Sequence, residues 1–164
     1  MCGIAGIHHP SRGASVPGPY LEAMAALLWH RGPDGFGFYR DEQVGLAHAR
    51  LSIIDLEGGW QPLPNEDRQV WIVFNGEIFN YVELRAELEE RGHTFSTKSD
   101  TEVIVHLYEE HGTTCLGRLN GQFAFAIWDK RNRRLFLARD RVGIRPLYYA
   151  SVGDELLFAS EVKA

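Results

Sequence analysis

The sequence predicts an α+β fold in which stacked antiparallel β-sheets are flanked by helices. Residues 70–74, which read VWIVF, are apolar at every position, as expected for a strand that is covered on both faces. Most of the strands that the sequence indicates follow one another at hairpin spacing, and two substantial helical segments interrupt them. Strands covered on both faces need a layer on each side, so layered sheets with outer helices are the expected arrangement.

The N-terminal part of the chain is predicted to form a strand, a loop and a helix. Residues 3–8 have the pattern of a short strand, and residues 9–19 are a loop rich in Pro, Ser and Gly. A helix is expected to follow and to stop before Gly32, because apolar residues recur there at spacings of three and four. The predicted apolar face consists of Tyr20, Leu21, Met24, Leu27 and Leu28.

Turns and strands alternate after this helix. The sequence RGPDG at residues 31–35 indicates a turn, since proline fixes φ and the glycines allow positive φ. Short strands are expected at residues 36–40 and 44–48. Residues 57–68 contain two prolines and show no clear periodicity, which predicts a loop that leads into the strand at residues 70–74.

Two helices with recognisable caps are predicted in the middle of the chain. Asn80 and Glu83 have the spacing of a capping box, and Gly92 is expected to end this helix. The sequence SDTE at residues 99–102 provides a second N-cap, for a helix that ends at Gly112. The predicted buried faces are Tyr81, Leu84 and Leu88 in the first helix, and Val103, Ile104, Leu107 and Tyr108 in the second.

The last third of the chain is dominated by strand patterns. A shorter helical turn at residues 113–119 is expected to bury Cys115 in the core. From Gly121 onwards, alternation places Phe123, Phe125 and Ile127 on one face of a strand, and Ala124, Ala126 and Trp128 on the other. A hairpin turn is expected at residues 131–133, with further strands at residues 135–138, 147–150 and 156–159.

Length, composition and charge restrict the class of protein. The 164 residues suit one domain, and no apolar run approaches the ~20 residues that cross a membrane. The net charge of −5 argues against a nucleic-acid partner, for which a basic balance is expected. Arginines concentrate between Lys130 and Arg145, which we interpret as a solvated hairpin rim, with an anion-binding or domain-docking surface as the alternative.

Neither the cysteines nor the histidines indicate a disulfide or a metal site. No positively charged leader precedes an apolar segment, so we expect a cytoplasmic protein with two reduced thiols. His8 and His9 point to opposite sides of a strand, and His106 and His111 do not share a helical face. Because no zinc-type spacing emerges, we predict no metal.

Cys2 is the strongest candidate for a catalytic group. Removal of the initiator Met1 would leave a thiol and a free α-amine on the same residue. That amine, with an unperturbed pKa of about 7.7 to 8.0, is suited to act as a general base for its own thiol near neutral pH. The alternative is a buried structural cysteine in an edge strand, and Cys2 by itself does not decide between the two.

Seven short motifs carry a resemblance to a known family. They are MCGIAG at residues 1–6, RGPDG at 31–35, HARLSIID at 48–55, FNGEI at 74–78, SDTE at 99–102, RDRVGIRPLYY at 139–149 and FASE at 158–161. In this order and spacing the chain resembles the glutaminase domain of class II glutamine amidotransferases, most closely that of glutamine-dependent asparagine synthetase. The resemblance covers residues 1–164 and implies the N-terminal-nucleophile hydrolase fold, a four-layer αββα sandwich of two antiparallel sheets.

The resemblance also implies a catalytic set. Cys2 would attack the side-chain amide carbon of glutamine, and its own α-amine would shuttle the proton. The Asn75 side-chain amide and the Gly76 backbone N–H would hold the oxyanion, as an uncharged donor and a residue that allows close backbone approach. The alternative is that Asn75 and Gly76 form only a tight turn after the strand at residues 70–74.

Three further residues are implied to bind the substrate. Arg50 would hold the α-carboxylate of glutamine and Asp100 its α-ammonium, an opposed pair that suits a zwitterion. Asp100 also lies where a helix cap belongs, and Arg50 could equally be a surface ion-pair partner. Glu77, next to Gly76, is an additional candidate. The turn at residues 31–35 is expected to shape the pocket wall and is assigned no chemistry.

The implied activity is hydrolysis of L-glutamine to glutamate and ammonia through a thioester on Cys2, after removal of Met1. In the family, ammonia passes to a C-terminal synthetase domain, where ATP activates an acceptor carboxylate, aspartate in the asparagine synthetases. That domain is absent from residues 1–164, so ATP and Mg are expected only there, and this domain should need no cofactor. The alternatives are an amidotransferase relative with another acceptor, and a non-catalytic docking or regulatory module on the same fold.

Expected partners follow from this assignment. They are L-glutamine and a C-terminal synthetase domain or subunit, with a homodimer as a further possibility, and neither nucleic acid nor a membrane is expected. The chain ends abruptly at residues 160–164 without a polar tail, so we expect that more protein follows.

Overall fold

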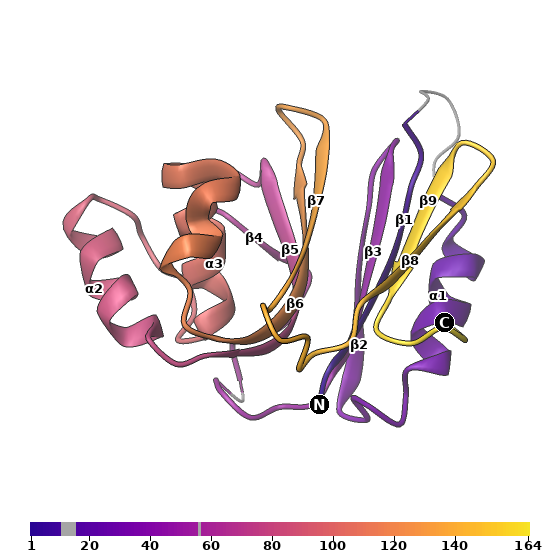
Figure 1. Cartoon of the computed structure of the whole chain (residues 1–164), viewed down its shortest axis with the longest axis horizontal. Coiled ribbons are helices and arrows are strands. Elements are labelled where there is room, and N and C mark those ends of the chain that lie inside the picture. The colour runs from indigo at the N-terminus through magenta and orange to yellow at the C-terminus, as the bar shows by residue number, and fades with distance from the viewer. Residues whose placement is uncertain (11–15, 56) are drawn as a thin grey trace.

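Two antiparallel β-sheets face each other, and helices cover their outer sides (Figure 1). The structure is a computed structural model that describes residues 1–10, 16–55 and 57–164. The five-stranded sheet has the order β2-β3-β1-β9-β8, with β1 Gly3–His8, β2 Gly35–Arg40, β3 Val44–Arg50, β8 Tyr148–Val152 and β9 Glu155–Ala159. The four-stranded sheet has the order β4-β5-β6-β7, with β4 Leu63–Pro64, β5 Val70–Ile78, β6 Gly121–Asp129 and β7 Arg134–Arg139.

The helices occupy the two outer layers. Helix α1 (Gly18–Leu27) packs on the five-stranded sheet, and α2 (Tyr81–Glu90) and α3 (Asp100–His111) lie on the far side of the four-stranded sheet, as Figure 1 shows. The 3₁₀ helix η1 (Gly112–Arg118) follows α3 directly. These four layers confirm the predicted α+β class and the αββα sandwich. Among the described residues, no helix is long and apolar enough to span a bilayer.

Three apolar clusters fill the three spaces between the four layers. One lies between α1 and the five-stranded sheet, one between the sheets, and one between the four-stranded sheet and helices α2 and α3. Strand β6 serves two of them, as its alternation predicted. Phe123, Phe125 and Ile127 point to the helices, whereas Ala124, Ala126 and Trp128 point to the facing sheet. Cys115 is buried in the helix-side cluster, also as predicted.

Helix α1 differs from its prediction in which side chains it buries. Leu21, Met24 and Leu28 are buried, but Tyr20 and Leu27 are 66% and 45% exposed. At 100° per residue, positions 20 and 27 lie roughly 100° or more around the helix from position 21, so they fall outside the stripe that faces the sheet. The part of the predicted loop at residues 11–15 lies outside the described residues.

The two predicted caps have different outcomes. Ser99 caps α3, and its Oγ accepts a hydrogen bond from the Thr101 N–H at 3.2 Å. Asn80 occupies the N-cap position of α2, but its side chain makes no capping bond. Its Oδ1 instead accepts from the Asn120 N–H at 2.9 Å, and its Nδ2 donates to the Arg118 carbonyl at 3.0 Å. The side chain therefore ties α2 to the segment after η1.

Strand β5 is longer than predicted. It runs on through Ile78, and Asn75 and Gly76 pair with Ala124 and Phe123 of β6. The interpretation of Asn75 and Gly76 as a tight turn is therefore wrong. Pairing with a strand some 50 residues away overrides the turn preference of the dipeptide. The predicted loop at residues 57–68 likewise contains the two-residue strand β4.

The N-terminal strand β1 is held on both sides. It pairs with β3 along its whole length and with β9 over its second half. The chain end that carries Cys2 thus enters the middle of a five-stranded sheet, where fraying is opposed by two ladders of hydrogen bonds.

Candidate active site

Cys2 lies immediately before β1, at one end of the space between the two sheets. Ile4 and Leu46 point into the core between the sheets, and Ile4 pairs with His48 of β3. Because side chains alternate along a strand, Cys2 shares the face of Ile4, and His48 and Arg50 share the face of Leu46. The register of β1 on β3 therefore brings the thiol beside a histidine and an arginine.

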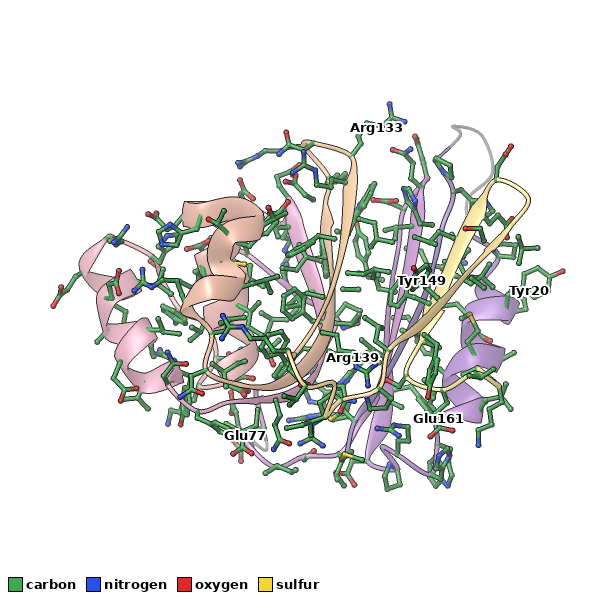
Figure 2. All side chains as sticks on the ribbon, in the orientation of Figure 1. Tyr20, Glu77, Arg133, Arg139, Tyr149 and Glu161 are labelled. Atoms are coloured by element: carbon green, nitrogen blue, oxygen red, sulfur yellow. The ribbon has the colours of Figure 1, made fainter. Side chains whose placement is uncertain are left out.

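The four-stranded sheet contributes the opposite wall. Val73 of β5 points into the same inter-sheet core, so Asn75, two residues on, points the same way. Glu77 follows in this row at the end of the strand and is exposed. Figure 2 labels Glu77 at the end of the sandwich where Figure 1 places the N-terminus, and Arg133 at the opposite end.

One narrow pocket of about 70 Å³ collects every residue that the sequence analysis singled out for catalysis or substrate binding. They are Cys2, Arg50, Asn75, Gly76, Glu77 and Asp100. They come from the residue before β1, from β3, from β5 and from the N-terminus of α3, and they are separated by up to 98 positions in the chain.

The Cys2 thiol is half-buried and bracketed by backbone. Its Sγ lies 3.4 Å from both the N–H and the carbonyl oxygen of Leu51. Burial raises the pKa of the thiol above its usual value, and the Leu51 N–H, the amino terminus and Arg50 only partly oppose that effect. The thiol is therefore protonated near neutral pH and needs a base before it can act as a nucleophile.

The turn at residues 31–35 anchors the backbone of Cys2. Arg31 Nε donates to the Cys2 carbonyl at 3.0 Å, and Arg31 also forms an ion pair with Glu161 at 3.1 Å. Gly32 is required at its position, because a Cβ there would lie 2.2 Å from the Ala49 carbonyl oxygen. This turn thus holds the backbone of Cys2, but none of its residues lines the pocket, so the expectation that it shapes the pocket wall is wrong.

Asn75 presents an unused hydrogen-bond donor to the pocket. Its side chain is buried, yet its Nδ2 has no hydrogen-bond partner among the described residues. A buried amide N–H without a partner costs about 1–3 kcal/mol, so such a group calls for an explanation. A ligand oxygen in the pocket would supply the missing acceptor.

The backbone N–H of Gly76 faces the same pocket edge. Its pairing partner Phe123 uses its own N–H and carbonyl with Asp140 of the segment after β7, so Gly76 and Phe123 do not bond to each other. The Gly76 N–H therefore points away from β6. The N–H groups of Phe74 and Ile78 point to that edge as well and are bound by side chains of Gln61 and Asp100, at 2.6 Å and 2.9 Å.

Gly76 must also be a glycine for steric reasons. A Cβ at this position would lie 2.2 Å from the carbonyl oxygen of Gln122 and 2.8 Å from the Cα of Phe123. Both are backbone atoms of β6, which cannot move aside without breaking the sheet. The close approach of β5 and β6 thus depends on the missing side chain.

Arg50 is a buried residue, and the alternative of a surface ion-pair partner is wrong. It is 3% exposed, and its guanidinium stacks on the ring of Trp60 at 4.6 Å. Its NH2 group donates to the Asp55 carbonyl at 2.7 Å. No carboxylate of the described chain forms an ion pair with it. This buried cation is therefore poised for an anionic group of a ligand.

Asp100 is the first residue of α3 and does not cap it, since Ser99 holds that position. Its Oδ2 accepts the Ile78 N–H at 2.9 Å, which connects the helix to the end of β5. Burial raises the pKa of Asp100 to about 6, although the Ile78 bond acts in the opposite direction and nearby Glu77 adds to the increase. A cationic group beside Asp100 would stabilise the charged carboxylate and offset the cost of its burial.

Two pocket residues had no assigned role in the sequence analysis. His48 is buried, both of its ring nitrogens lack partners in the described chain, and burial lowers its pKa to about 3, so the ring is neutral. Gln61 is buried and bridges Phe74 to Thr101, whose Oγ1 lies 3.1 Å from its Nε2. The HARLSIID motif contains His48, whereas Gln61 lies in a loop without any pattern.

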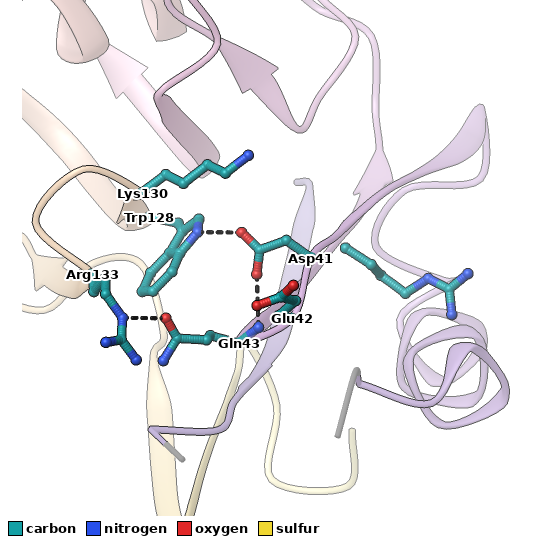
Figure 3. A pocket seen from close by; sticks show the side chains of 7 residues that line it. Asp41, Glu42, Gln43, Trp128, Lys130 and Arg133 are labelled. Carbon is teal, nitrogen blue, oxygen red and sulfur yellow. Dashed lines mark hydrogen bonds between the residues drawn. The ribbon is translucent and has the colours of Figure 1, made fainter. Parts of the chain in front are cut away.

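A larger cavity lies at the other end of the sandwich. A cleft of about 840 Å³ lies between the β2–β3 turn and the β6–β7 hairpin (Figure 3). Four of its polar side chains bind one another in two pairs: Trp128 Nε1 donates to Asp41 at 2.7 Å, and Arg133 Nε donates to Gln43 at 2.6 Å. Since these donors and acceptors are already paired, we place the chemistry in the smaller pocket at Cys2, where they are not.

Comparisons with known proteins identify the family of this chain. A family model described as a glutamine amidotransferase domain matches residues 1–164. The chain is 48% identical to asparagine synthetase [glutamine-hydrolyzing] 1 of Bacillus subtilis (strain 168) and 44% identical to asparagine synthetase [glutamine-hydrolyzing] 2 of Arabidopsis thaliana. Both matches cover all of this chain but only 26% and 28% of those proteins, so the chain spans about a quarter of their length.

A solved structure shows the same fold. Glutamine phosphoribosylpyrophosphate amidotransferase from Bacillus subtilis superimposes with a TM-score of 0.76 at 25% sequence identity. The match covers 99% of this chain and 42% of that one. Part of a larger, different amidotransferase therefore has the same layered arrangement.

Proposed function

Because this chain belongs to the glutamine amidotransferase family of domains, we propose that its pocket hydrolyses L-glutamine to glutamate and ammonia, with Cys2 as the nucleophile. The observation that carries the proposal is the unpartnered Nδ2 of Asn75, which lines the same pocket as the Cys2 thiol. A donor without an acceptor beside a nucleophile is what an oxyanion site requires.

The first step needs a base, because the Cys2 thiol is protonated. In the chain that begins at Cys2, the α-amine and Sγ belong to the same residue, so the amine lies close to the thiol. Burial lowers the pKa of the Met1 α-amine, and the same surroundings would favour the neutral, proton-accepting form of an amine at Cys2. The amine takes the thiol proton, Sγ bonds to the amide carbon of glutamine, and the carbonyl π electrons move to its oxygen.

The resulting oxyanion is held by two donors. They are the Asn75 side-chain amide and the Gly76 N–H, both on the pocket edge of β5. The carbon–nitrogen bond then breaks, the amine returns its proton to the leaving nitrogen as ammonia departs, and a γ-glutamyl thioester remains on Cys2. Water, deprotonated by the same amine, attacks this thioester and releases glutamate and the thiol.

The remaining polar groups of the pocket bind the amino-acid end of the substrate. Arg50 takes the α-carboxylate and Asp100 the α-ammonium, and Glu77 stands beside Asp100 as a further carboxylate. Arg50 and Asp100 are both buried, and neither has an ion-pair partner in the described chain. A zwitterion is the ligand that satisfies both charges without adding net charge.

We further propose that the ammonia serves a synthetase domain, which would hold ATP and Mg and use aspartate as the acceptor. The proposal is supported by relatives that are about four times as long and are named as glutamine-hydrolysing asparagine synthetases. The 139–149 segment is the proposed contact surface. It carries Val142, Ile144 and Tyr149, which are 80%, 55% and 73% exposed, and its Arg145 lines the mouth of the Cys2 pocket. Tyr149 is labelled in Figure 2.

The test is glutamate release by protein whose intact mass shows that Met1 has been removed. We expect turnover of glutamine, and we expect an electrophilic glutamine analogue to add one equivalent of mass at Cys2. The Cys2→Ala variant should keep the fold, as measured by circular dichroism, and release no glutamate. Turnover by Cys2→Ala, or no turnover by folded protein that begins at Cys2, would refute the assignment.

A further inference from the structure

Outside the Cys2 pocket, two histidines and two glutamates meet on the helix side of the four-stranded sheet. Glu66 lies in the β4–β5 loop, His93 follows α2, and His106 and Glu109 are one turn apart on α3. One ligand-type atom from each of the four lies within 4.8 Å of every other. None of the four lines the Cys2 pocket as described.

We propose that Glu66, His93, His106 and Glu109 bind one divalent transition-metal ion, and that zinc is the ion they fit best. Two imidazole nitrogens with two carboxylate oxygens suit zinc, whereas magnesium and calcium take oxygen ligands. A tetrahedral zinc site with bonds of about 2.0 to 2.2 Å has its ligand atoms roughly 3.3 to 3.5 Å apart.

The observed separations are close to those values. His106 Nδ1 lies 3.5 Å from Glu66 Oε2 and 2.9 Å from Glu109 Oε2. His93 Nδ1 lies 3.6 Å from Glu66 Oε1 and 3.9 Å from Glu109 Oε2. The two imidazole rings are 4.7 Å apart, centroid to centroid, and both direct Nδ1 at the carboxylates. Shifts of a fraction of an ångström to about one ångström would complete the coordination.

Each of the two imidazoles has a carboxylate behind it. His93 Nε2 is 3.0 Å from Glu110 Oε1, which orients the ring with Nδ1 toward the cluster. His106 is fully buried, and its Nε2 has no hydrogen-bond partner in the described chain, although Glu102 Oε1 lies only 3.8 Å away. A carboxylate on the outer nitrogen of a ligating histidine is the usual support of a metal site.

The two candidate carboxylate ligands are also held from behind. Asn65 Nδ2 donates to Glu109 Oε1 at 2.6 Å, which leaves Oε2 directed at the cluster. The Thr94 N–H donates to Glu66 Oε1 at 3.1 Å, which leaves Oε2 toward His106. Three of the four candidate ligands are thus hydrogen-bonded from behind, and Glu102 lies near the outer nitrogen of the fourth, His106.

The competing occupant of this cluster is a proton. Burial lowers the pKa of His106, but its interactions with Glu102 and Glu109 outweigh burial and raise it to about 9. An imidazolium at His106 would satisfy Glu109 without any metal. A metal ion would have to displace the Nδ1 proton, so zinc binding should release about one proton per ion at neutral pH and weaken as the pH falls.

The sequence did not indicate this cluster, because its candidate ligands come from three separate segments of the chain. His93 and His106 are 13 positions apart, and only His106 and Glu109 have a helical spacing. The expectation of no metal considered only histidines close in the chain. The ion would tie together the β4–β5 loop, the segment after α2 and helix α3.

The test uses the full chain with Cys2→Ser, so that the thiol cannot bind metal, stripped with a chelator and titrated with zinc against a chromophoric competitor. We expect one saturable equivalent, an increase in the melting temperature, and proton release. Cobalt in place of zinc should give visible d–d bands of tetrahedral intensity without thiolate charge transfer. His93→Gln and Glu66→Gln, both at the accessible rim, should each weaken binding at least tenfold.

His111→Gln, which changes a histidine of α3 outside the cluster, should bind zinc like the Cys2→Ser parent. Circular dichroism of the metal-free variants checks that each is folded. The proposal is overturned if no equivalent of zinc binds, or if zinc binds the His93→Gln and Glu66→Gln variants as tightly as it binds the parent. It is also overturned if only a proton occupies the cluster, which would appear as a melting temperature that depends on pH but not on zinc.

Discussion

Ile4 and Ser160 exchange two hydrogen bonds across 156 positions of the chain. The Ile4 N–H donates to Ser160 Oγ at 2.9 Å, and the Ser160 N–H donates to the Ile4 carbonyl at 2.8 Å. Both residues are fully buried. This pair extends the β1–β9 ladder by one step toward Cys2, so the far end of the chain fixes the strand that carries the nucleophile.

The first prediction concerns this pair. Ser160→Ala leaves the Ile4 N–H without an acceptor in a buried position, which should cost about 1–3 kcal/mol of unfolding free energy. Glutamate release should fall as well, since the strand end at Cys2 is less well held. Urea denaturation and a glutaminase assay measure the two effects. Ser151→Ala, on exposed β8, is the matched control and should change stability by less than about 0.5 kcal/mol.

The second prediction isolates the Asn75 amide. Asn75→Ala should lower kcat by about a hundredfold to a thousandfold and leave KM nearly unchanged, because the donor acts on the oxyanion and not on the bound substrate. Stability should not fall, since Nδ2 has no partner to lose in the described chain. Asn75→Asp should be slower still, because a carboxylate repels the developing charge. A large rise in KM with normal kcat would contradict this role.

The prediction for Gly76 is mainly steric. Gly76→Ala places a Cβ 2.2 Å from the Gln122 carbonyl oxygen in the backbone of β6, and should cost roughly 1–3 kcal/mol. Gly117→Ala is the matched control, since nothing lies within 4 Å of its added Cβ and its φ is not positive. That substitution should be neutral or stabilise by up to about 1 kcal/mol. Chemical denaturation of both variants tests the pair, and equal stabilities would contradict the argument.

These residues show what the sequence could and could not reveal. The alternation at residues 123–128 assigned each side chain of β6 to its layer, because a period of two reports burial directly. The Asn75-Gly76 dipeptide was ambiguous because its turn preference is local, whereas its place in β5 depends on pairing with β6. The motifs therefore predicted which residues line the pocket, whereas local turn and strand preferences did not predict the backbone conformation of Asn75 and Gly76.

Contacts between distant segments could not be predicted at all. The Ile4–Ser160 bonds and the bridge from Gln61 to Phe74 depend on strand order and loop path, which no periodicity encodes. Asp100 illustrates a middle case. Its position after Ser99 suggested a helix cap, but the geometry gives the cap to Ser99 and frees Asp100 to face the pocket. Moving the N-cap position by one residue, from Asp100 to Ser99, changes the role of both side chains.

The last prediction follows from the raised pKa of Asp100. The pKa of Asp100 in the folded protein is about 6, against an ordinary value of 3.8 for an aspartate side chain. Between these values the folded state binds more protons than the unfolded state, so stability falls as the pH rises from about 4 to 6 and stays lower above that range. Asp100→Asn removes the burial of a charge and should stabilise the protein at pH 7, by as much as roughly 3 kcal/mol.

The same substitution should impair substrate binding. Asparagine can still accept the Ile78 N–H, so the link between β5 and α3 survives, but it offers no charge to the α-ammonium of glutamine. KM should therefore rise by tenfold or more, and the component of the acid limb of kcat/KM that titrates near pH 6 should disappear in Asp100→Asn, which leaves only the limb set by the α-amine. Denaturation at pH 4, 6 and 7 together with pH-rate profiles provides the measurement. If Asp100→Asn gains less stability over the parent at pH 7 than at pH 4, the buried charge of Asp100 does not destabilise the parent. If the component near pH 6 persists in Asp100→Asn, Asp100 does not bind the ammonium.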